Sequence, residues 1–212
     1  AIAVSNQNSY LKPPPIKTPP IPGGEISNSK INPNVRQSTQ REECISTPID
    51  EIPFYQFGST VGLENLVGNE GGDWFFELNI DEMSIISIDL CNGFTNYDAY
   101  LRVFDGCPLD GGVEIYANDD GPVCDLDSAP YEPSLLDPLI LNPGEYTIVV
   151  DGYGASEGNF GISIGYSTVQ DCSGGDVGQE LIGNYGNGAC DNGENGLPDF
   201  NCCDWDYDAN DC

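Results

Sequence analysis

Between residues 44 and 168, apolar and polar side chains alternate in a series of short stretches. A period of two is typical of a strand with one buried face, and it occurs over residues 86–90, 100–103, 146–151 and 160–166, with further apolar runs at 74–78 and 113–116. Residues that favour turns separate the stretches, at 105–106, 110–112, 120–122, 142–144 and 151–152. Seven or eight short strands at this spacing predict an all-β fold, a β-sandwich.

Residues 1–43 differ from this region because they are rich in Pro and poor in large apolar side chains. The prolines at 13–15, 19–20 and 22 favour an extended polyproline II conformation. This composition is typical of a disordered leader. An ordered arm would instead have to lie on its own body or on a neighbouring subunit, to which residues 1–4 and 25–31 could each add an edge strand.

Charge divides the chain at the same place. Residues 1–43 hold five of the six Lys and Arg residues against three acids and carry +2, whereas residues 44–212 hold Arg102 against 32 acids and carry −31. A body this acidic repels itself unless divalent cations or a basic segment neutralise it. Docking of the arm on an acidic surface would use its cations and first apolar residues, namely Ile2, Val4, Lys12, Lys17, Lys30, Arg36 and Arg41.

Composition also argues against two classes of partner. A duplex phosphate backbone needs a cationic face, which residues 44–212 lack, so we expect no nucleic-acid partner. No apolar run approaches the roughly 18 residues of a membrane-spanning helix, so we expect no membrane span. Residues 1–3, Ala-Ile-Ala, fit the start of a chain whose signal peptide was removed.

Nine cysteines and no histidine indicate disulfides rather than zinc sites. The first four are spread along the predicted strand ends, which suits an oxidising, extracellular compartment. Because the number is odd, one thiol is free, paired between chains or part of a strained bond. The candidates for the disulfide framework are Cys44, Cys91, Cys107, Cys124, Cys172, Cys190, Cys202, Cys203 and Cys212.

Six motifs between residues 44 and 168 resemble those of a known family. They include Phe-Gly-Ser-Thr-Val-Gly at 57–62 and Asp-Trp-Phe-Phe at 73–76, and they continue at 96–105 with Cys107, 118–120, 142–153 and 158–160. In this order they resemble the pre-peptidase C-terminal domain of bacterial secreted proteases and surface proteins. The resemblance implies a jelly-roll-like sandwich with a non-catalytic accessory or adhesive role. It also implies that Cys44 pairs with Cys91 and Cys107 with Cys124.

A second resemblance concerns residues 169–212. Gly-Asn-Gly-Ala-Cys-Asp at 186–191, Cys-Asp-Trp-Asp at 203–206 and Asn-Asp-Cys at 210–212 resemble the Lin-12/Notch repeat, a small disulfide knot around one calcium ion. That family has six cysteines whereas this segment has five, so its disulfide connectivity stays open. The resemblance implies a third unit, a small calcium-binding module stabilised by disulfides.

The residues of this unit also favour calcium by themselves. Acids alternate near its end, and calcium takes six to eight oxygen ligands at about 2.3–2.6 Å. A solvated acidic tail is the alternative, but such a tail needs neither Trp205 nor cysteines on both sides. The candidate ligands are Asn187, Asp191, Asn195, Asp204, Asp206, Asp208 and Asp211, with Asn210 beside them.

A second acidic cluster is expected in the sandwich. Ordinary Asx turns at strand ends are the alternative explanation for these residues, but three consecutive polar groups at 118–120 exceed what one turn needs. The sequence therefore predicts a second calcium site with the ligands Asp98, Asn118, Asp119 and Asp120, and with Asp105 and Asp151 as further members of the cluster.

Catalysis has little support in the sequence. Without His, neither a Ser–His nor a Cys–His couple can form, and pairs of acids are uninformative in a chain with 35 of them, so we expect no enzyme.

Ser128 lies in an Asp-Ser-Ala tripeptide that resembles a bacterial O-glycosylation site, although it is more simply a loop residue. Aromatic side chains could stack on sugars, although in a sandwich they are more often core; the candidates are Trp74, Tyr97, Tyr153 and Trp205.

Two functions are compatible with these features. The first is a secreted structural protein, a calcium-stabilised subunit of an extracellular filament or layer at a bacterial surface. The arm of one copy would dock on the sandwich of the next, and such a head-to-tail contact propagates because it does not close. The alternative is a calcium-dependent carbohydrate- or matrix-binding adhesive module, whose partners are glycans rather than further copies.

Overall fold

The computed structural model describes residues 44–91, 93–121, 134–202 and 205–212. The expectations for the arm, including its residues from Ile2 to Arg41, concern residues 1–43 and lie outside the described residues. The same holds for Cys124, Ser128, Cys203 and Asp204.

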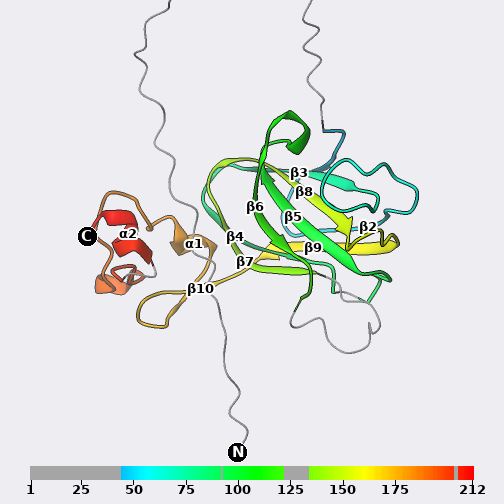
Figure 1. The fold of residues 1–212 in the computed structure, drawn as a ribbon. Helices are drawn as coiled ribbons and strands as arrows, with labels where there is room; N and C mark the ends of the chain where they lie inside the picture. Colours follow the sequence, from blue (N-terminus) through cyan, green and yellow to red (C-terminus); the bar gives the residue numbers. More distant parts are fainter. Residues whose placement is uncertain (1–43, 92, 122–133, 203–204) are drawn as a thin grey trace, which may run out of the picture.

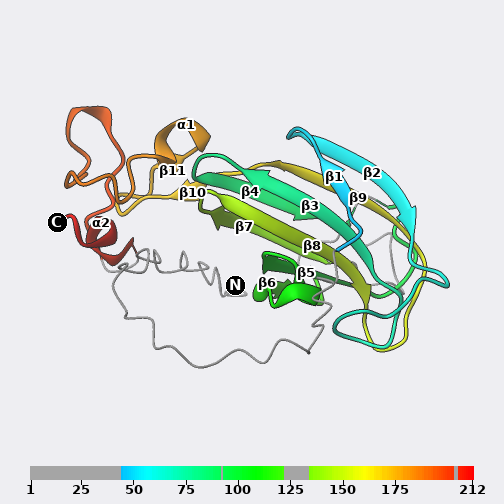
Figure 2. The same cartoon turned by 90° about the horizontal axis from the view of Figure 1, so that it is seen from above.

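Two main sheets pack face to face in the described part of the chain (Figures 1 and 2). Neighbouring strands pair antiparallel, except that β1 and β3 are parallel. The first sheet has the order β1-β3-β8-β5-β6, formed by Thr47–Ile49, Trp74–Ile80, Gly144–Gly152, Ala99–Asp105 and Val113–Asn118. The second has the order β2-β9-β4-β7, formed by Phe54–Ser59, Asn159–Tyr166, Ser84–Asp89 and Leu135–Leu141.

The period-two pattern explains the interior of the sandwich. Alternate residues of β4 (Ile86 and Ile88) and of β9 (Ile162 and Ile164) face the first sheet, whose central strand β8 contributes Ile148. All five are at most 1% exposed and belong to one hydrophobic cluster that joins the two sheets. Polar residues between them face outwards, as a pleated strand requires. The all-β sandwich predicted from the sequence is therefore confirmed.

Three strands form where the sequence pattern is weak. β7 contains Pro138, which removes a backbone donor, but β7 is an edge strand of its sheet and tolerates that loss. β1 has three residues. β2 carries Tyr55 and Phe57 on an exposed face, whereas Phe54 packs against the core, so its aromatic residues do not mark one buried side.

Residues 169–212 form a small unit, the C-terminal module, which packs at one end of the sandwich (Figures 1 and 2). Its regular elements are short, and none of the helices in the described residues is long and apolar enough to cross a bilayer. The regular elements of the module are the paired strands β10 (Val169–Gln170) and β11 (Asp176–Val177), the helices α1 (Gln179–Ile182) and α2 (Asp206–Asn210), and the 3-10 turn η2 (Glu194–Gly196). A further 3-10 turn, η1 (Pro108–Asp110), lies in the sandwich.

The module covers part of the outer face of the second sheet. Ile85 of β4 and Ile140 of β7 are 0% and 5% exposed because they pack with the module's own core, which includes Ile182. The Gln179 side chain adds three hydrogen bonds across this contact. Its Oε1 accepts from the Ile85 amide at 3.0 Å, and its Nε2 donates to the Met83 carbonyl at 2.8 Å and to the Ser84 hydroxyl at 3.2 Å. The module is thus attached to the sandwich by both apolar and polar contacts.

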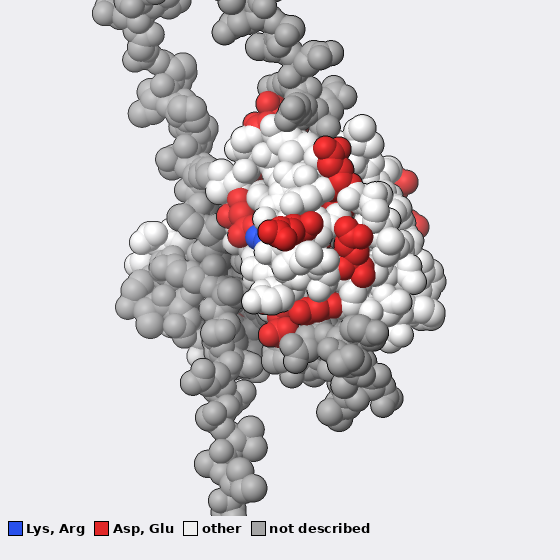
Figure 3. Space-filling model, turned by 45° about the vertical axis from the view of Figure 1, so that its right-hand side comes forward, with Lys and Arg blue, Asp and Glu red and all other residues white. Residues whose placement is uncertain are grey.

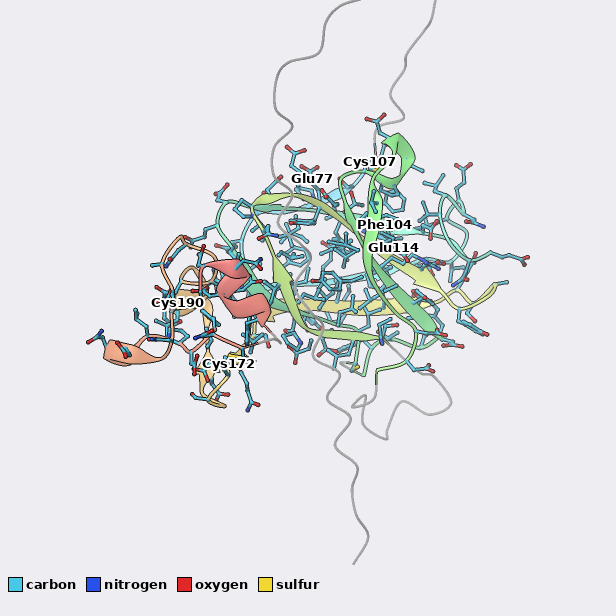
Figure 4. The ribbon with its side chains drawn as sticks, turned by 60° about the vertical axis from the view of Figure 1, so that its left-hand side comes forward. Glu77, Phe104, Cys107, Glu114, Cys172 and Cys190 are labelled. Atoms are coloured by element: carbon cyan, nitrogen blue, oxygen red, sulfur yellow. A yellow bond between two sulfur atoms is a disulfide. The ribbon has the colours of Figure 1, made fainter. Side chains whose placement is uncertain are left out.

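Three disulfides join cysteines that lie within the described ranges. Cys44 bonds to Cys107, Cys172 to Cys202, and Cys190 to Cys212. Figure 4 shows Cys172 and Cys190 in the C-terminal module, away from Cys107. Disulfides persist in oxidising compartments, which indicates an extracellular or periplasmic protein.

The pairing implied for the sandwich, Cys44 with Cys91 and Cys107 with Cys124, is wrong. Cys44 packs on the outer face of the first sheet, against the cluster of Phe75, Phe104 and Val149, and there it meets Cys107. Cys91 instead follows β4 of the second sheet. It is also disulfide-bonded, to a partner outside the described residues.

Candidate metal centres

Three acids meet at one end of the first sheet. Asp98 directly precedes β5, and Asp119 and Asp120 directly follow β6, the antiparallel neighbour of β5. The start of one strand therefore lies beside the end of the other. One carboxylate oxygen from each acid lies within 4.8 Å of the other two.

Asp98 carries the strongest indication of a ligand at this place. Its Oδ1 is buried and has no hydrogen-bond partner among the described residues. A buried carboxylate oxygen without a donor is costly. Burial raises the pKa of Asp98, and the negative charge of the neighbouring Asp120 raises it further. A bound cation would offset both the lost hydration and the repulsion between the two acids.

The geometry fits calcium. Two oxygens that bind one Ca²⁺ at about 2.4 Å lie no more than about 5 Å apart, in agreement with the separation of the three carboxylates. Carboxylate oxygens are the ligands that this hard cation prefers, and water or backbone carbonyls would complete its shell. We call Asp98, Asp119 and Asp120 the acidic triad.

Asn118 and Ser134 hold the turn that carries two members of the triad. The Asn118 Nδ2 donates to the Asp120 carbonyl at 3.2 Å, and its Oδ1 accepts from the Leu135 amide at 3.1 Å. The Ser134 hydroxyl donates to the Asp119 carbonyl at 2.7 Å. These bonds give Asn118 a structural role beside the triad, and its role as a ligand stays a prediction.

The other two acids of the predicted cluster do not belong to the triad. Asp105 ends β5, at the opposite end of the strand from Asp98. Asp151 lies on β8, is fully buried, and accepts hydrogen bonds from the Asn69 amide at 3.0 Å and from the Arg102 Nε at 3.2 Å. The strand pattern placed all of these acids near strand ends, but it did not show that Asp105 lies at the opposite end of β5, nor that Asp151, beside the start of β5, binds Arg102.

Arg102 is neutralised on the outer face of the first sheet. Besides its bond to Asp151, its Nη1 donates to Glu114 Oε2 at 2.8 Å, and its guanidinium lies 4.1 Å from the centre of the Tyr100 ring. Two acids therefore share this one cation. The sequence signal for this network was the isolated positive charge within an alternating strand, and its partners could not be identified without the register of β5 and β8.

A further buried acid, Asp73, closes the loop between β2 and β3. Its Oδ2 accepts hydrogen bonds from the amides of Leu66 at 2.6 Å and Val67 at 2.8 Å, whereas its Oδ1 is buried and has no partner among the described residues. Burial raises the pKa of Asp73 to about 6, the two amides oppose this rise, and the charge of Asp151 adds to it. Sequence reasoning placed Asp73 in a family motif without assigning it a role.

In the C-terminal module, Asp208 lies at the centre of the predicted ligands. Its side chain is fully buried, with Oδ1 accepting from the Gly186 amide at 2.9 Å and Oδ2 from the Asp191 amide at 2.7 Å. Asp191 is itself buried and accepts from the Asn187 Nδ2 at 3.3 Å. Burial and, next, the charge of Asp208 raise the pKa of Asp191. These carboxylates hold turns of the backbone together.

The module therefore gathers part of its predicted ligand set. Asn187, Asp191 and Asp208 lie together, and Asp211 accepts from the Gly188 amide at 2.6 Å. Asn195 is instead exposed within η2. Among the described residues, no three acids of the module meet as those of the triad do. Calcium in the module, with Asp206 at the start of α2 and Asp204 as further ligands, stays a prediction.

The aromatic side chains considered for sugar stacking divide into two groups. Tyr97 is 4% and Trp205 6% exposed, so both belong to the interior, and Trp74 packs edge-to-face on Phe160. Tyr153 is exposed. A different set, Tyr55, Phe57 and Phe94, is exposed and in mutual contact. The aromatic residues at alternate positions of β2 were the signal for this set.

An acidic cavity lies beside the disulfide at which residues 1–43 join the sandwich. It has a volume of about 630 Å³ and is lined by Cys44 and Cys107 together with four acids: Glu77, Asp105, Asp110 and Glu145. Figure 4 shows Glu77 near Cys107 at this end of the sandwich.

No protein-family model matches the sequence, and a search of curated proteins finds no similar one. Two solved structures are similar in shape to part of the chain. One is the pre-peptidase C-terminal domain of a collagenase from Bacillus anthracis, with 13% identity, a TM-score of 0.36, and coverage of 56% of this chain and 93% of that one. The other is PliG from Aeromonas hydrophila, a periplasmic inhibitor of g-type lysozyme, with 14% identity, a TM-score of 0.34, and coverage of 56% and 95%. At these low TM-scores the two likenesses carry no argument about function.

Proposed function

We propose that the protein is a secreted, non-catalytic structural subunit, stabilised by Ca²⁺, that assembles head to tail through residues 1–43. One observation carries the proposal. Residues 44–212 hold 32 acids and Arg102, and Arg102 is already bound by Asp151 and Glu114. The negative charge of the surface therefore has no counter-charge within its own sequence region. Figure 3 shows acidic side chains around a single basic patch on one face.

Two sources of positive charge are available to this surface. Calcium at the acidic triad would neutralise one end of the first sheet. Residues 1–43 supply the other source, because their sequence carries five Lys and Arg residues. The acidic cavity beside Cys44 offers a concave receptor for such side chains, with Glu77 and Glu145 among its acids. A basic segment that docks on the acidic surface of another copy leaves that copy's own segment available, so the contact repeats.

Ion pairs are insufficient to hold such an arm. Ordering a residue costs about 1–2 kcal/mol, and an exposed ion pair contributes less than about 1 kcal/mol. Docking therefore requires burial of apolar side chains, and the sequence of the arm offers Ile2, Val4 and a series of prolines.

The assembly is tested by deleting residues 1–43. We expect the full chain to form polymers visible by negative-stain electron microscopy, and the deletion variant to sediment as a monomer that keeps the β-sheet band of the circular dichroism spectrum. Polymers that persist after the deletion would refute the arm as the connector.

The calcium part of the proposal is tested separately by thermal unfolding. At a calcium concentration of about one hundred times Kd, binding adds about 2.7 kcal/mol to the free energy of unfolding. We expect Ca²⁺ to raise the melting temperature of the full chain and EDTA to reverse the effect. Asp98→Asn should remove most of the increase, and Asp81→Asn, at an exposed turn, should retain it. An unchanged melting curve in excess EDTA would contradict the metal sites.

A further inference from the structure

Three aromatic side chains form an exposed strip on the outer face of the second sheet. Tyr55 and Phe57 of β2 and Phe94, which follows β4, are 49%, 52% and 57% exposed. The ring centres of Tyr55 and Phe57 lie 4.9 Å apart, and those of Phe57 and Phe94 4.4 Å apart. We call these three residues the aromatic strip. Such a cluster of large apolar side chains at the surface marks an interaction site more often than single exposed residues do.

The surface beside the aromatic strip carries small side chains. On the adjacent strand β9, Ser163 stands opposite Tyr55, and Gly161 stands opposite Phe57. On the next strand, Asp89 of β4 stands opposite Ser163 and so places a carboxylate in the same row. Small side chains next to exposed rings leave space for a chain to lie against the sheet, with an acid within the same face.

The geometry of the rings distinguishes between two kinds of occupant. Neighbouring rings are nearly perpendicular, at 87° and 71°, so the three cannot present their faces in one plane, as stacking along a flat sugar chain requires. Rings set at an angle to one another instead suit the ridged surface of a polyproline II helix, which is the mode in which Pro-rich segments dock on aromatic surfaces.

The dimensions also agree with a polyproline II segment. Its three residues per turn rise by roughly 9 Å in total, and the two ring separations limit the strip to about the same length. Because the conformation is already formed in the free peptide, little entropy is lost on docking.

The chain itself contains a segment of this kind. Residues 11–22 read Leu-Lys-Pro-Pro-Pro-Ile-Lys-Thr-Pro-Pro-Ile-Pro. They include six prolines, two isoleucines that each adjoin a proline, and two cations, Lys12 and Lys17. The cations match the acidic body and the carboxylate of Asp89. In sequence the segment ends 22 residues before Cys44, and an extended chain of that length spans roughly 70 Å, enough to reach a neighbouring molecule.

We propose that residues 11–22 of one copy dock as a polyproline II helix on the Tyr55–Phe57–Phe94 strip of another. This inference rests on the proposed function and names the apolar contact that the arm requires. Proline and isoleucine side chains pack between the rings, and Lys12 or Lys17 lies toward the Asp89 side of the strip.

The contact is tested by photo-cross-linking in the full chain. Phe57 is replaced by p-benzoylphenylalanine, and copies with ¹⁴N and ¹⁵N are mixed before irradiation and mass spectrometry. We expect cross-links from position 57 to residues 11–22 that join peptides of different isotopic label. The same substitution at Tyr153, which is 55% exposed, should give no such cross-links. Cross-links to residues 11–22 of the same copy, or to other segments, would overturn the proposal.

A pair of variants separates this inference from the proposed function. Tyr55→Ser with Phe57→Ser should weaken assembly of the full chain at least tenfold, measured by sedimentation, whereas Tyr153→Ser should leave it unchanged. If deletion of residues 1–43 abolishes assembly and the strip variant does not, the docking site is wrong while the arm remains the connector. If the strip variant instead loses binding to a purified bacterial polysaccharide and position 57 gives no cross-link to 11–22, the strip is a glycan site.

Discussion

The sandwich and the C-terminal module are stabilised by different means. The sandwich buries a continuous layer of Ile, Leu, Val and Phe side chains between its two sheets. The module has a small core in which Tyr185, Phe200 and Trp205 pack at ring separations of 4.8–5.7 Å, and its described residues include two disulfides. A unit of about 40 residues buries too little apolar surface to fold without such cross-links. The same kind of bond should therefore matter differently in the two regions.

The largest expected effect is the loss of a disulfide in the module. Cys172→Ser with Cys202→Ser opens a loop of 30 residues, at a cost of about 3–4 kcal/mol, which exceeds what the small core can supply. We expect the amides of the module to lose protection from hydrogen exchange and the fluorescence of buried Trp205 to shift to longer wavelength. The sandwich should keep its protected strands.

The matched variant is Cys44→Ser with Cys107→Ser in the sandwich. It opens a longer loop of 63 residues, for which chain entropy gives about 4 kcal/mol. Because the apolar layer remains, the sandwich should stay folded with a lower melting temperature. If the module kept its protection without its own disulfide, the contrast between the two regions would be wrong.

The next effect concerns the buried acid at the centre of the module. Asp208→Ala removes the acceptors of two backbone amides, those of Gly186 and Asp191, and should cost about 2–4 kcal/mol. Asp208 also has a positive φ of 56°, which Asn tolerates better than Ala. We therefore expect Asp208→Asn to cost less than Asp208→Ala, and Asp176→Ala, at an exposed position, to cost little. The measurement is hydrogen exchange at the two amides.

Sequence reasoning succeeded where one local rule decides the structure. Alternation at 86–90 and 160–166 predicted β4 and β9 because burial of one strand face depends on residue type alone. The triad was predicted in part, since Asp98, Asp119 and Asp120 lie at predicted strand ends.

The rest depended on information that spacing does not contain. The partner of Cys44 depends on how the segment before β1 crosses the first sheet, and the role of Asp151 depends on the register of three strands. In the module, buried carboxylates rather than periodic apolar residues fix the turns, so the pattern that identified the sandwich gave no elements there.

The two regions also differ in how the oxygens of their buried acids are hydrogen-bonded. We expect this difference to affect how stability depends on pH. Both oxygens of Asp208 accept amides, whereas the Oδ1 of Asp73 in the sandwich has no partner among the described residues. Because the pKa of Asp73 is raised from 3.8 to about 6, the folded state binds the proton more tightly than the unfolded state. The contribution of Asp73 to stability is therefore present below pH 4 and is lost as the pH rises to about 6 and above.

Asp73→Asn should remove the loss of stability that accompanies ionisation of Asp73. We expect the variant to be more stable than the wild type at pH 7 by about 2 kcal/mol, with a smaller difference at pH 4, measured by urea unfolding. The amide oxygen can still accept from Leu66 and Val67, while the orphaned oxygen is replaced by an uncharged group. Asp81→Asn is the control. A variant that is less stable at pH 7 would show that the charge of Asp73 has a partner, such as a bound cation.

The smallest effect tests whether the two regions unfold together. Gln179→Leu leaves the Ile85 amide and the Met83 carbonyl without their partner while it keeps the apolar contact, so we expect a loss of about 1–2 kcal/mol. Weaker attachment should also separate the calorimetric unfolding of the module from that of the sandwich. Glu180→Leu, at the exposed neighbouring position, should leave the unfolding profile unchanged. A single sharp transition in the Gln179 variant would mean that the apolar contact of Ile85 and Ile140 with the module is sufficient to couple the two regions.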